Sequence, residues 1–340
     1  MMKTWSWISH IGPSASLFLI VHASADECSD EKVSAYQKEL DSVVYGEFDY
    51  LLWFAGTDGL HSPTVATGKS PHLNSKWSSG VRATIGGQPS HWDTQLCYTY
   101  YSTRSQDKSH ANSDTILAST PTTAGIFEVG EKWNLHFNRL DWQLGRKLLF
   151  GHRFLLEPFF GLEGLDVSQK FDLNVNTIFL DLTTSLPATN VVDSNNKNSL
   201  LAIGPRAGFK ANFDFINGFG LYGNFGINLL WGKFKIKQTY SQIDYFSSGA
   251  STVLVDQTRQ ISQNGSVLNT DLEIGFNWRY LFQKSDVEFQ LKAGWEQHYY
   301  IDIVRFRDFY LQQVSLGTAA YTTNGNLFLS GWTFGALLRY

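Results

Sequence analysis

The chain has 340 residues, of which 27 are basic and 31 acidic, giving a formal net charge of −4. General binders of nucleic acids and other polyanions need a basic excess, so this balance argues against that class. No run of about 18 or more apolar residues occurs, so a helical membrane protein is also excluded. Aromatic residues make up 15% of the chain and glycine occurs 29 times. Aromatic residues and glycine are both frequent in the tilted strands and aromatic belts of membrane barrels.

The first 25 residues predict a cleaved secretory signal peptide. Lys3 supplies the positive end, Leu17–Val21 is the most apolar stretch, and Ala25 ends a run of small residues typical of cleavage sites. Cleavage after Ala25 would export the chain. Residues 26–45 follow as a short periplasmic segment, and the three- and four-residue spacing of its apolar side chains favours a short helix there.

Two cysteines are present, Cys28 and Cys97. Export permits a disulfide between them. However, Cys97 lies in a strand pattern and Cys28 in the polar segment after the signal, so their pairing stays open. No His and Cys cluster has the spacing of a zinc or haem site. The sequence therefore predicts no metal and no cofactor.

From Gly46 to Tyr340 the apolar residues recur at every second position, which is typical of strands with one apolar face. Ten segments show this pattern: 46–56, 76–86, 91–102, 132–144, 152–166, 200–213, 219–240, 266–282, 287–303 and 326–340. Within 132–144 the apolar set changes face near Asn138-Arg139, which predicts a β-bulge. Asn217-Gly218 predicts a tight hairpin turn.

The links between these segments alternate in length. Four short links (87–90, 145–151, 214–218 and 283–286) separate five long, polar ones (57–75, 103–131, 167–199, 241–265 and 304–325). An up-and-down outer-membrane barrel has this arrangement, with short periplasmic turns and long extracellular loops. The pattern predicts an all-β, transmembrane antiparallel barrel of about ten strands, ten to twelve, over residues 46–340.

Backbone hydrogen bonding assigns the two faces of the predicted strands. In hydrocarbon only a helix or a closed sheet satisfies every N–H and C=O group. The apolar set must then face lipid, and the polar set must line the interior. The alternative is an exported soluble β-domain with its apolar face inside, but that domain would gather its many charges on one exposed face.

The predicted lumen-lining residues carry charges of both signs. They are Arg82, Glu157, Glu163, Arg206, Lys210, Glu273, Arg279, Glu288, Lys292 and Glu296. Charged groups of this kind pair across a lumen and set the ion preference of a channel. The sequence does not indicate which of them pair.

The last segment, 326–340, ends the chain on an aromatic residue. Trp332, Phe334, Leu338 and Tyr340 lie on one face of the predicted strand. In outer-membrane barrels such residues face lipid, and aromatic rings gather at the membrane interface. We therefore expect outer-membrane lipid to surround this face and Tyr340 to anchor it.

Several short motifs resemble the Legionella-type major outer membrane protein family of pore-forming barrels, which also occurs in chlamydia-related bacteria. The motifs are Leu156-Glu157-Pro158-Phe159-Phe160-Gly161-Leu162, Ile203-Gly204-Pro205-Arg206-Ala207-Gly208, Gly220-Leu221-Tyr222-Gly223-Asn224, Leu272-Glu273-Ile274-Gly275-Phe276-Asn277-Trp278 and Ala293-Gly294-Trp295-Glu296-Gln297. The resemblance covers roughly Gly46 to Tyr340 and implies a pore-forming outer-membrane protein whose closing strand is read by the barrel-assembly machinery. With only two cysteines, the chain departs from the chlamydial major porins and their disulfide-linked network.

These patterns favour a passive channel for ions or small solutes. Around eight strands a barrel interior is filled by side chains, and wide pores need about 16, so ten strands predict a narrow or plugged lumen. One alternative is a structural or adhesive barrel whose loops contact a host surface. A second is a barrel protease or lipase that uses Glu296 and His298, although their position favours polar lumen lining. We predict no catalytic residue and no nucleic-acid partner, and homo-oligomer formation stays open.

Overall fold

The computed structural model describes residues 43–58, 60, 76–89, 92–110, 125–151, 153–180, 184, 186–215, 217–282, 287–309 and 320–340. All of these belong to one compact unit, Leu40–Tyr340. The predicted signal peptide and Cys28 lie outside the described residues. Within the described ranges, no helix is long and apolar enough to cross a membrane.

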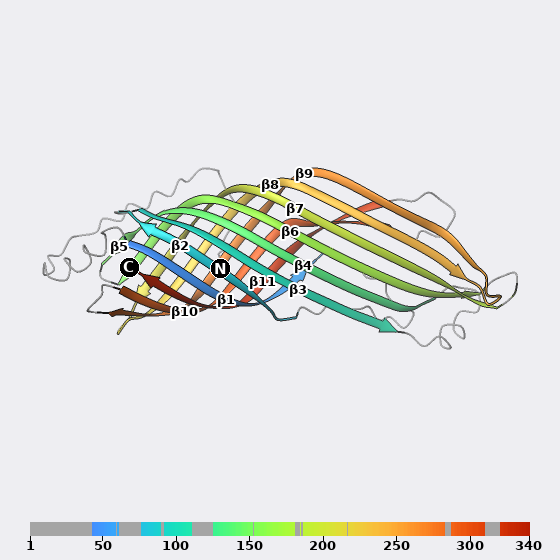
Figure 1. Ribbon diagram of the computed structural model, residues 1–340, viewed down its shortest axis with the longest axis horizontal. Helices are drawn as coiled ribbons and strands as arrows, with labels where there is room; N and C mark the ends of the chain where they lie inside the picture. Colours follow the sequence, from blue (N-terminus) through green and yellow to red (C-terminus); the bar gives the residue numbers. More distant parts are fainter. Residues whose placement is uncertain are drawn as a thin grey trace, which may run out of the picture. The chain divides into compact units, whose positions relative to one another are not determined.

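The strands form one antiparallel sheet that closes into a ring (Figure 1). In chain order they are β1 (Val43–Thr57), β2 (Ser78–Gln88), β3 (Trp92–His110), β4 (Gly125–Arg146), β5 (Leu148–Phe150), β6 (Phe154–Leu180), β7 (Pro187–Asp214), β8 (Phe219–Tyr245), β9 (Ser251–Phe282), β10 (Val287–Phe309) and β11 (Ala320–Arg339). β1 pairs with both β2 and β11, and β4 pairs with β3 and β6, so ten strands complete the ring. The predicted ten-stranded up-and-down barrel is confirmed, with the three-residue β5 as an addition beside β6.

The last residue, Tyr340, continues the hydrogen-bond ladder between β1 and β11. The N–H of Tyr340 donates to the carbonyl of Val44 at 2.9 Å, and the N–H of Val44 donates to the carbonyl of Tyr340 at 2.9 Å. β1 and β11 pair continuously from Tyr45 and Arg339 to Thr57 and Leu327. The closing strand is therefore fixed along its length, while the side chain of Tyr340 remains exposed.

Side chains alternate between an exposed apolar outer face and a buried inner face, as the sequence predicts. On β9, Ile274, Phe276 and Tyr280 are exposed, whereas Glu273 and Asn277, at positions of the opposite parity, are buried. Figure 1 shows the tilted strands, with β6 to β9 running far past β1 and β2 at the end opposite the C-terminus. We call the end that holds the links 89–91, 215–218 and 283–286 the short-turn end.

Four predicted long loops are wrong in extent. Residues 103–131 include the end of β3 and the start of β4, and residues 304–325 include the end of β10 and the start of β11. The segment 167–199 consists mostly of the ends of β6 and β7, which pair from Phe154 and Phe213 to Leu180 and Pro187. The segment 241–265 similarly belongs largely to β8 and β9. Beyond the membrane a strand needs no outward apolar residues, because water satisfies polar side chains there. The polar composition of these segments therefore concealed their strands.

The predicted bulge at Asn138-Arg139 is also wrong. β4 pairs with β3 without a register shift, and its shift against β6 lies between Ile126 and Glu128. Leu135 and Phe137 point inward, whereas Leu140 points outward, and the alternation between them is unbroken. The apolar residues of β4 lie on the inner face up to Phe137 and on the outer face from Leu140 onward. The change occurs because the interior is apolar beside Phe137 and polar beside Arg139.

The predicted hairpin turn at Asn217-Gly218 is confirmed by its backbone. Asn217 has φ 58° and Gly218 has φ 84°, the left-handed values that this two-residue turn requires. A Cβ on Gly218 would also overlap the carbonyl oxygen of Arg279. The turn therefore needs glycine for both its backbone angle and its space.

We expect Gly218→Ala to lower the free energy of unfolding by about 2–3 kcal/mol, because a strained left-handed backbone and a backbone clash add together. Gly249→Ala is a matched control, since Gly249 has the same φ of 84° but nothing within 4 Å of its Cβ position. The control should lose only about 1 kcal/mol in urea titrations of the refolded barrel. Equal losses would show that the contact with Arg279 is unimportant.

Candidate functional site

The candidate site is the interior of the ring, because inward side chains from all ten strands meet there. The structure places every predicted lumen residue on this inner face. Glu157, Glu163, Arg206, Glu273, Glu288 and Glu296 are buried, and Arg82, Lys210, Arg279 and Lys292 are half-buried. The contacts among them form three successive levels, starting from the short-turn end.

The first level closes the short-turn end with polar pairs. Lys210 donates to Gln95 at 2.8 Å and pairs with Glu157 at 3.2 Å, so one ammonium group links β7 to β3 and β6. The hydroxyl of Tyr45 donates to Asp93 at 2.6 Å. Two further pairs, Arg339 with Glu288 and Arg279 with Asp214, complete this level.

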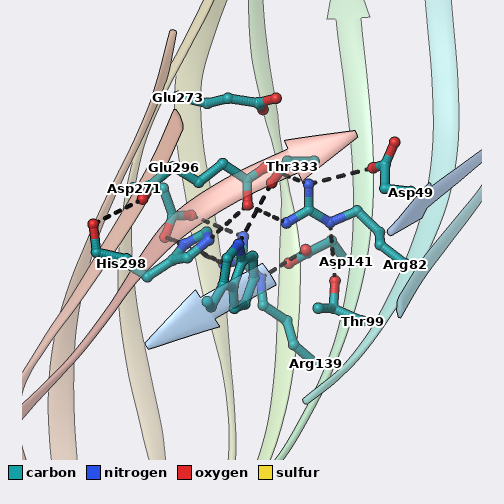
Figure 2. Close-up of polar contacts among 12 residues, drawn as sticks. Asp49, Arg82, Thr99, Arg139, Asp141, Asp271, Glu273, Glu296, His298 and Thr333 are labelled. Carbon is teal, nitrogen blue, oxygen red and sulfur yellow. Dashed lines mark hydrogen bonds and ion pairs between the residues drawn. The ribbon is translucent and has the colours of Figure 1, made fainter. Parts of the chain in front are cut away.

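The second level bridges strands that are not neighbours in the ring. The guanidinium of Arg82 on β2 donates two hydrogen bonds to Glu296 on β10, at 2.5 and 2.8 Å, and contacts Asp49 at 3.5 Å. Figure 2 shows this fork between the two carboxylates. Lys292 pairs with Glu47 at 2.5 Å and with Asp49 at 3.2 Å. Because β1 and β11 separate β2 from β10 in the sheet, the Arg82–Glu296 pair crosses the interior.

The third level joins β4 to β9, on the far side of the ring. Arg139 pairs with Asp141 at 2.7 Å, with Asp271 at 2.8 Å and with Glu163 at 3.3 Å. Arg206 shares all three carboxylates, at 3.4 Å, 2.9 Å and 3.2 Å respectively. Two guanidinium groups thus neutralise most of the charge of three buried carboxylates, and a low-dielectric interior makes such complete pairing necessary.

His298 connects the second and third levels. Its Nδ1 lies 2.6 Å from Asp271, and its Nε2 lies 3.3 Å from Glu296 (Figure 2). His298 and Glu296 are 6% and 1% exposed. The pair considered for a barrel protease is therefore enclosed by ion pairs on the strands around it. We define the charged plug as His298 together with eight residues of the second and third levels: Asp49, Arg82, Arg139, Asp141, Glu163, Arg206, Asp271 and Glu296.

Five members of the charged plug are additional to the predicted lumen residues: Asp49, Arg139, Asp141, Asp271 and His298. Four of them could have been predicted from the sequence, because every second residue of a strand points to the same face. Asp271, for example, lies two residues before the predicted Glu273, and His298 lies two residues after Glu296. Arg139 was obscured, because the apparent change of face near it suggested a bulge.

An apolar core fills the interior beyond the charged plug, on the side away from the short-turn end. Its largest members are Trp53, Tyr101, Trp133, Phe137, Phe234, Tyr300 and Phe306, each at most 2% exposed. The ring of Trp53 lies 4.9 Å from His298 and 5.5 Å from Tyr101, so it joins the core to the charged plug. Phe137 and Tyr300 meet edge to face at 5.7 Å. The sequence reasoning missed this core because it assigned every inward position to a polar lining.

The charged side chains of the interior are engaged in ion pairs with one another. Among the described side chains, no group of three or more His, Cys, Asp or Glu residues is placed to hold a metal ion. The carboxylates of the charged plug are directed at guanidinium groups instead. Removing one of the guanidinium groups would leave buried carboxylates incompletely paired, and such a loss strongly destabilises a buried ion-pair network.

Comparisons with known proteins identify a family. The model of the family described as "Legionella pneumophila major outer membrane protein precursor" matches residues 42–339. No curated protein sequence matches the chain. Among solved structures, the outer membrane protease OmpT from Escherichia coli is similar over 88% of this chain and 96% of its own, at 11% identity and a TM-score of 0.38. A major outer membrane protein from Thermus thermophilus matches 88% of this chain and 99% of its own, at 10% identity and a TM-score of 0.26. A Pseudomonas aeruginosa FadL homologue matches 88% and 90%, at 9% identity and a TM-score of 0.28.

Proposed function

The chain belongs to the Legionella-type major outer membrane protein family, and from that premise we propose that it is a closed bacterial outer-membrane barrel that acts at the cell surface. The barrel holds the chain in the outer membrane. The ends of β6, β7, β8 and β9 away from the short-turn end form a sheet that extends beyond the bilayer, which we call the raised sheet. In this proposal the raised sheet, rather than the lumen, contacts the partner on a host surface.

The observation that carries this proposal is the low exposure of the inward side chains. A water-filled channel would leave its lining accessible to solvent. Here Glu163 and Trp53, in the charged plug and the apolar core, are 0% and 1% exposed. Ion pairs between strands that are not neighbours, such as Arg139 on β4 with Asp271 on β9, also tie distant parts of the ring together. A small barrel filled by its own side chains serves as a scaffold more readily than as a diffusion pore.

The raised sheet is the second support. β6, β7, β8 and β9 have 27, 28, 27 and 32 residues, whereas about 9–11 residues suffice for a tilted strand to cross a bilayer. A second small apolar cluster, Val129, Val175, Val192 and Tyr240, stiffens this sheet beyond the apolar core. Such lengths of ordered strand have no use in spanning the membrane, but they present a rigid surface to the outside.

Shortening the two longest hairpins tests this function. Residues 173–194 and 241–256 are each replaced by Asn-Gly, so that the hairpins close on the existing pairs Asp172–Asn195 and Tyr240–Gln257. We expect the shortened barrel to insert normally, as judged by heat-modifiable gel mobility, because the apolar core and the charged plug are retained. Attachment of producing bacteria to cultured host cells should fall to the level of cells without the protein. Unchanged attachment by a correctly inserted variant would refute the surface role.

A narrow ion channel is the second candidate function. It is supported by the mixed charges that line the membrane-spanning interior, since Arg82 and Arg206 each have more than one carboxylate within reach. Exchange of partners in such a network would open a path for ions. In that case, neutralising Lys210 and Arg279 should shift the reversal potential in a salt gradient toward cation preference.

A further inference from the structure

Five outward lysines form a cluster on three adjacent strands, which we call the lysine patch: Lys170, Lys197, Lys233, Lys235 and Lys237. Lys170 on β6 pairs directly with Lys197 on β7, and Lys197 pairs directly with Lys237 on β8. Lys233 and Lys235 follow on the same face of β8, since Phe234 and Ile236 between them are buried in the interior. The side chains therefore project from the outer wall of the barrel.

The lysine patch lies where the lipid-facing apolar surface ends. On β8 the outward residue before Lys233 is Trp231, and on β7 the direct partner of Lys233 is Leu201. Trp231 and Leu201 are 52% and 70% exposed, as expected of side chains that face lipid. The patch is on the side away from the short-turn end. With short turns in the periplasm, it therefore lies at the level of the outer-leaflet headgroups.

The charges of the lysine patch are poorly compensated by the protein itself. Like charges placed directly opposite on neighbouring strands destabilise a sheet. Asp172 pairs with Lys170 at 3.2 Å. Over the described part of the chain, no carboxylate forms an ion pair with Lys197, Lys233, Lys235 or Lys237. A ligand that supplies negative charge at this height would remove the repulsion.

The neighbouring side chains suit a phosphorylated sugar. Ser199 and Ser262 are the direct partners of Lys235 on either side, and Asn264 is the partner of Lys233. Their hydroxyl and amide groups are able to hydrogen-bond sugar hydroxyls and phosphate oxygens. Ammonium groups form charge-assisted hydrogen bonds with phosphate, and a row of them at a membrane surface favours anionic headgroups.

We propose that the lysine patch binds the phosphorylated headgroup of a glycolipid in the outer leaflet. The continuity of the patch with the lipid-facing surface favours a membrane lipid over a soluble anion, because the acyl chains would lie against Trp231 and Leu201 below. This site is independent of the closed lumen and of the host-facing role.

The test measures retention of lipid A by the full-length refolded barrel, using native mass spectrometry from detergent. Bisphosphorylated lipid A is compared with dephosphorylated lipid A and with phosphatidylglycerol. We expect the wild type to retain the bisphosphorylated form and to lose the other two under the same conditions. Inorganic phosphate should not displace it. Equal retention of the dephosphorylated form would overturn the proposal, and displacement by inorganic phosphate would assign the patch to a soluble anion instead.

The second part of the test removes positive charges from the lysine patch and measures lipid A binding again. The triple variant Lys197→Gln, Lys235→Gln and Lys237→Gln should lower affinity by about a hundredfold, since each lysine near an anionic surface is worth about a fivefold change. A control, Lys108→Gln, Arg146→Gln and Arg153→Gln, removes the same charge elsewhere on the exposed surface and should retain lipid as the wild type does. Both variants are compared only after heat-modifiable mobility shows them folded. The single variant Lys235→Gln should show a smaller loss if the triple variant does not fold. Wild-type retention by a folded lysine-patch variant would contradict the assignment.

Discussion

Replacing Arg139 with methionine should lower the free energy of unfolding of the barrel by about 3–5 kcal/mol, which is the cost of breaking a buried ion pair from one side. Arg139 is 5% exposed and pairs with Asp141, Asp271 and Glu163. Its loss would leave three buried carboxylates to share Arg206. Urea titrations of the refolded protein in lipid vesicles, followed by tryptophan fluorescence, measure the difference.

Arg104→Met is the matched control for this prediction. Arg104 is on the neighbouring strand β3 but points outward, is exposed, and donates to Gln106 at 3.3 Å. Its replacement should change the free energy of unfolding by no more than about 0.5 kcal/mol. If both variants unfolded at the same urea concentration, the charged plug would not hold the barrel together in the way the ion pairs imply.

Phe276→Arg should cost about 2–4 kcal/mol, because it places a charge near the middle of the lipid-facing surface. Phe276 is 66% exposed on the outer face of β9, between the exposed Ile274 and the half-buried Trp278. Exposure of so large an apolar side chain is stable only where lipid covers it. Refolding into vesicles at increasing urea concentration gives the free energy.

Thr258→Arg provides the comparison on the same strand. Thr258 is also outward and exposed, but it lies beyond the apolar surface and its direct partner on β8 is the uncharged Thr239, so arginine there should be tolerated. Asn277, the neighbour of Phe276, points inward, is buried and donates to Asn212 at 2.6 Å. A bulky charge there must disturb the packed interior, so Asn277 is a poor control. Equal costs for Phe276→Arg and Thr258→Arg would mean that lipid does not border Phe276.

The ring of strands was predictable because alternation is a local property. Residues such as Ile274, Phe276 and Tyr280 reveal their common face without reference to any other strand. The strand number and the turn at Asn217-Gly218 follow from the same short-range signals. The confirmed part of the fold is thus the part that depends on neighbours in sequence.

The pairing inside the barrel was not predictable, because it depends on which strands lie opposite each other once the ring closes. Arg82 and Glu296 are far apart in sequence and belong to strands that do not hydrogen-bond, so no local pattern connects them. The apolar core was concealed for another reason. Trp133, Leu135 and Phe137 have the composition of a lipid-facing set, and only their register against β3 and β6 shows that they point inward.

Single-channel recording in planar bilayers measures whether the interior of the barrel is closed to ions. The refolded wild-type barrel should insert and show no steady conductance steps, while a general-diffusion porin recorded in the same bilayers shows them. Insertion is verified independently by protection of the reconstituted barrel from protease. Steady, ohmic steps from the wild-type protein would contradict the account, because ions would then be passing through the space that the charged plug and the apolar core occupy.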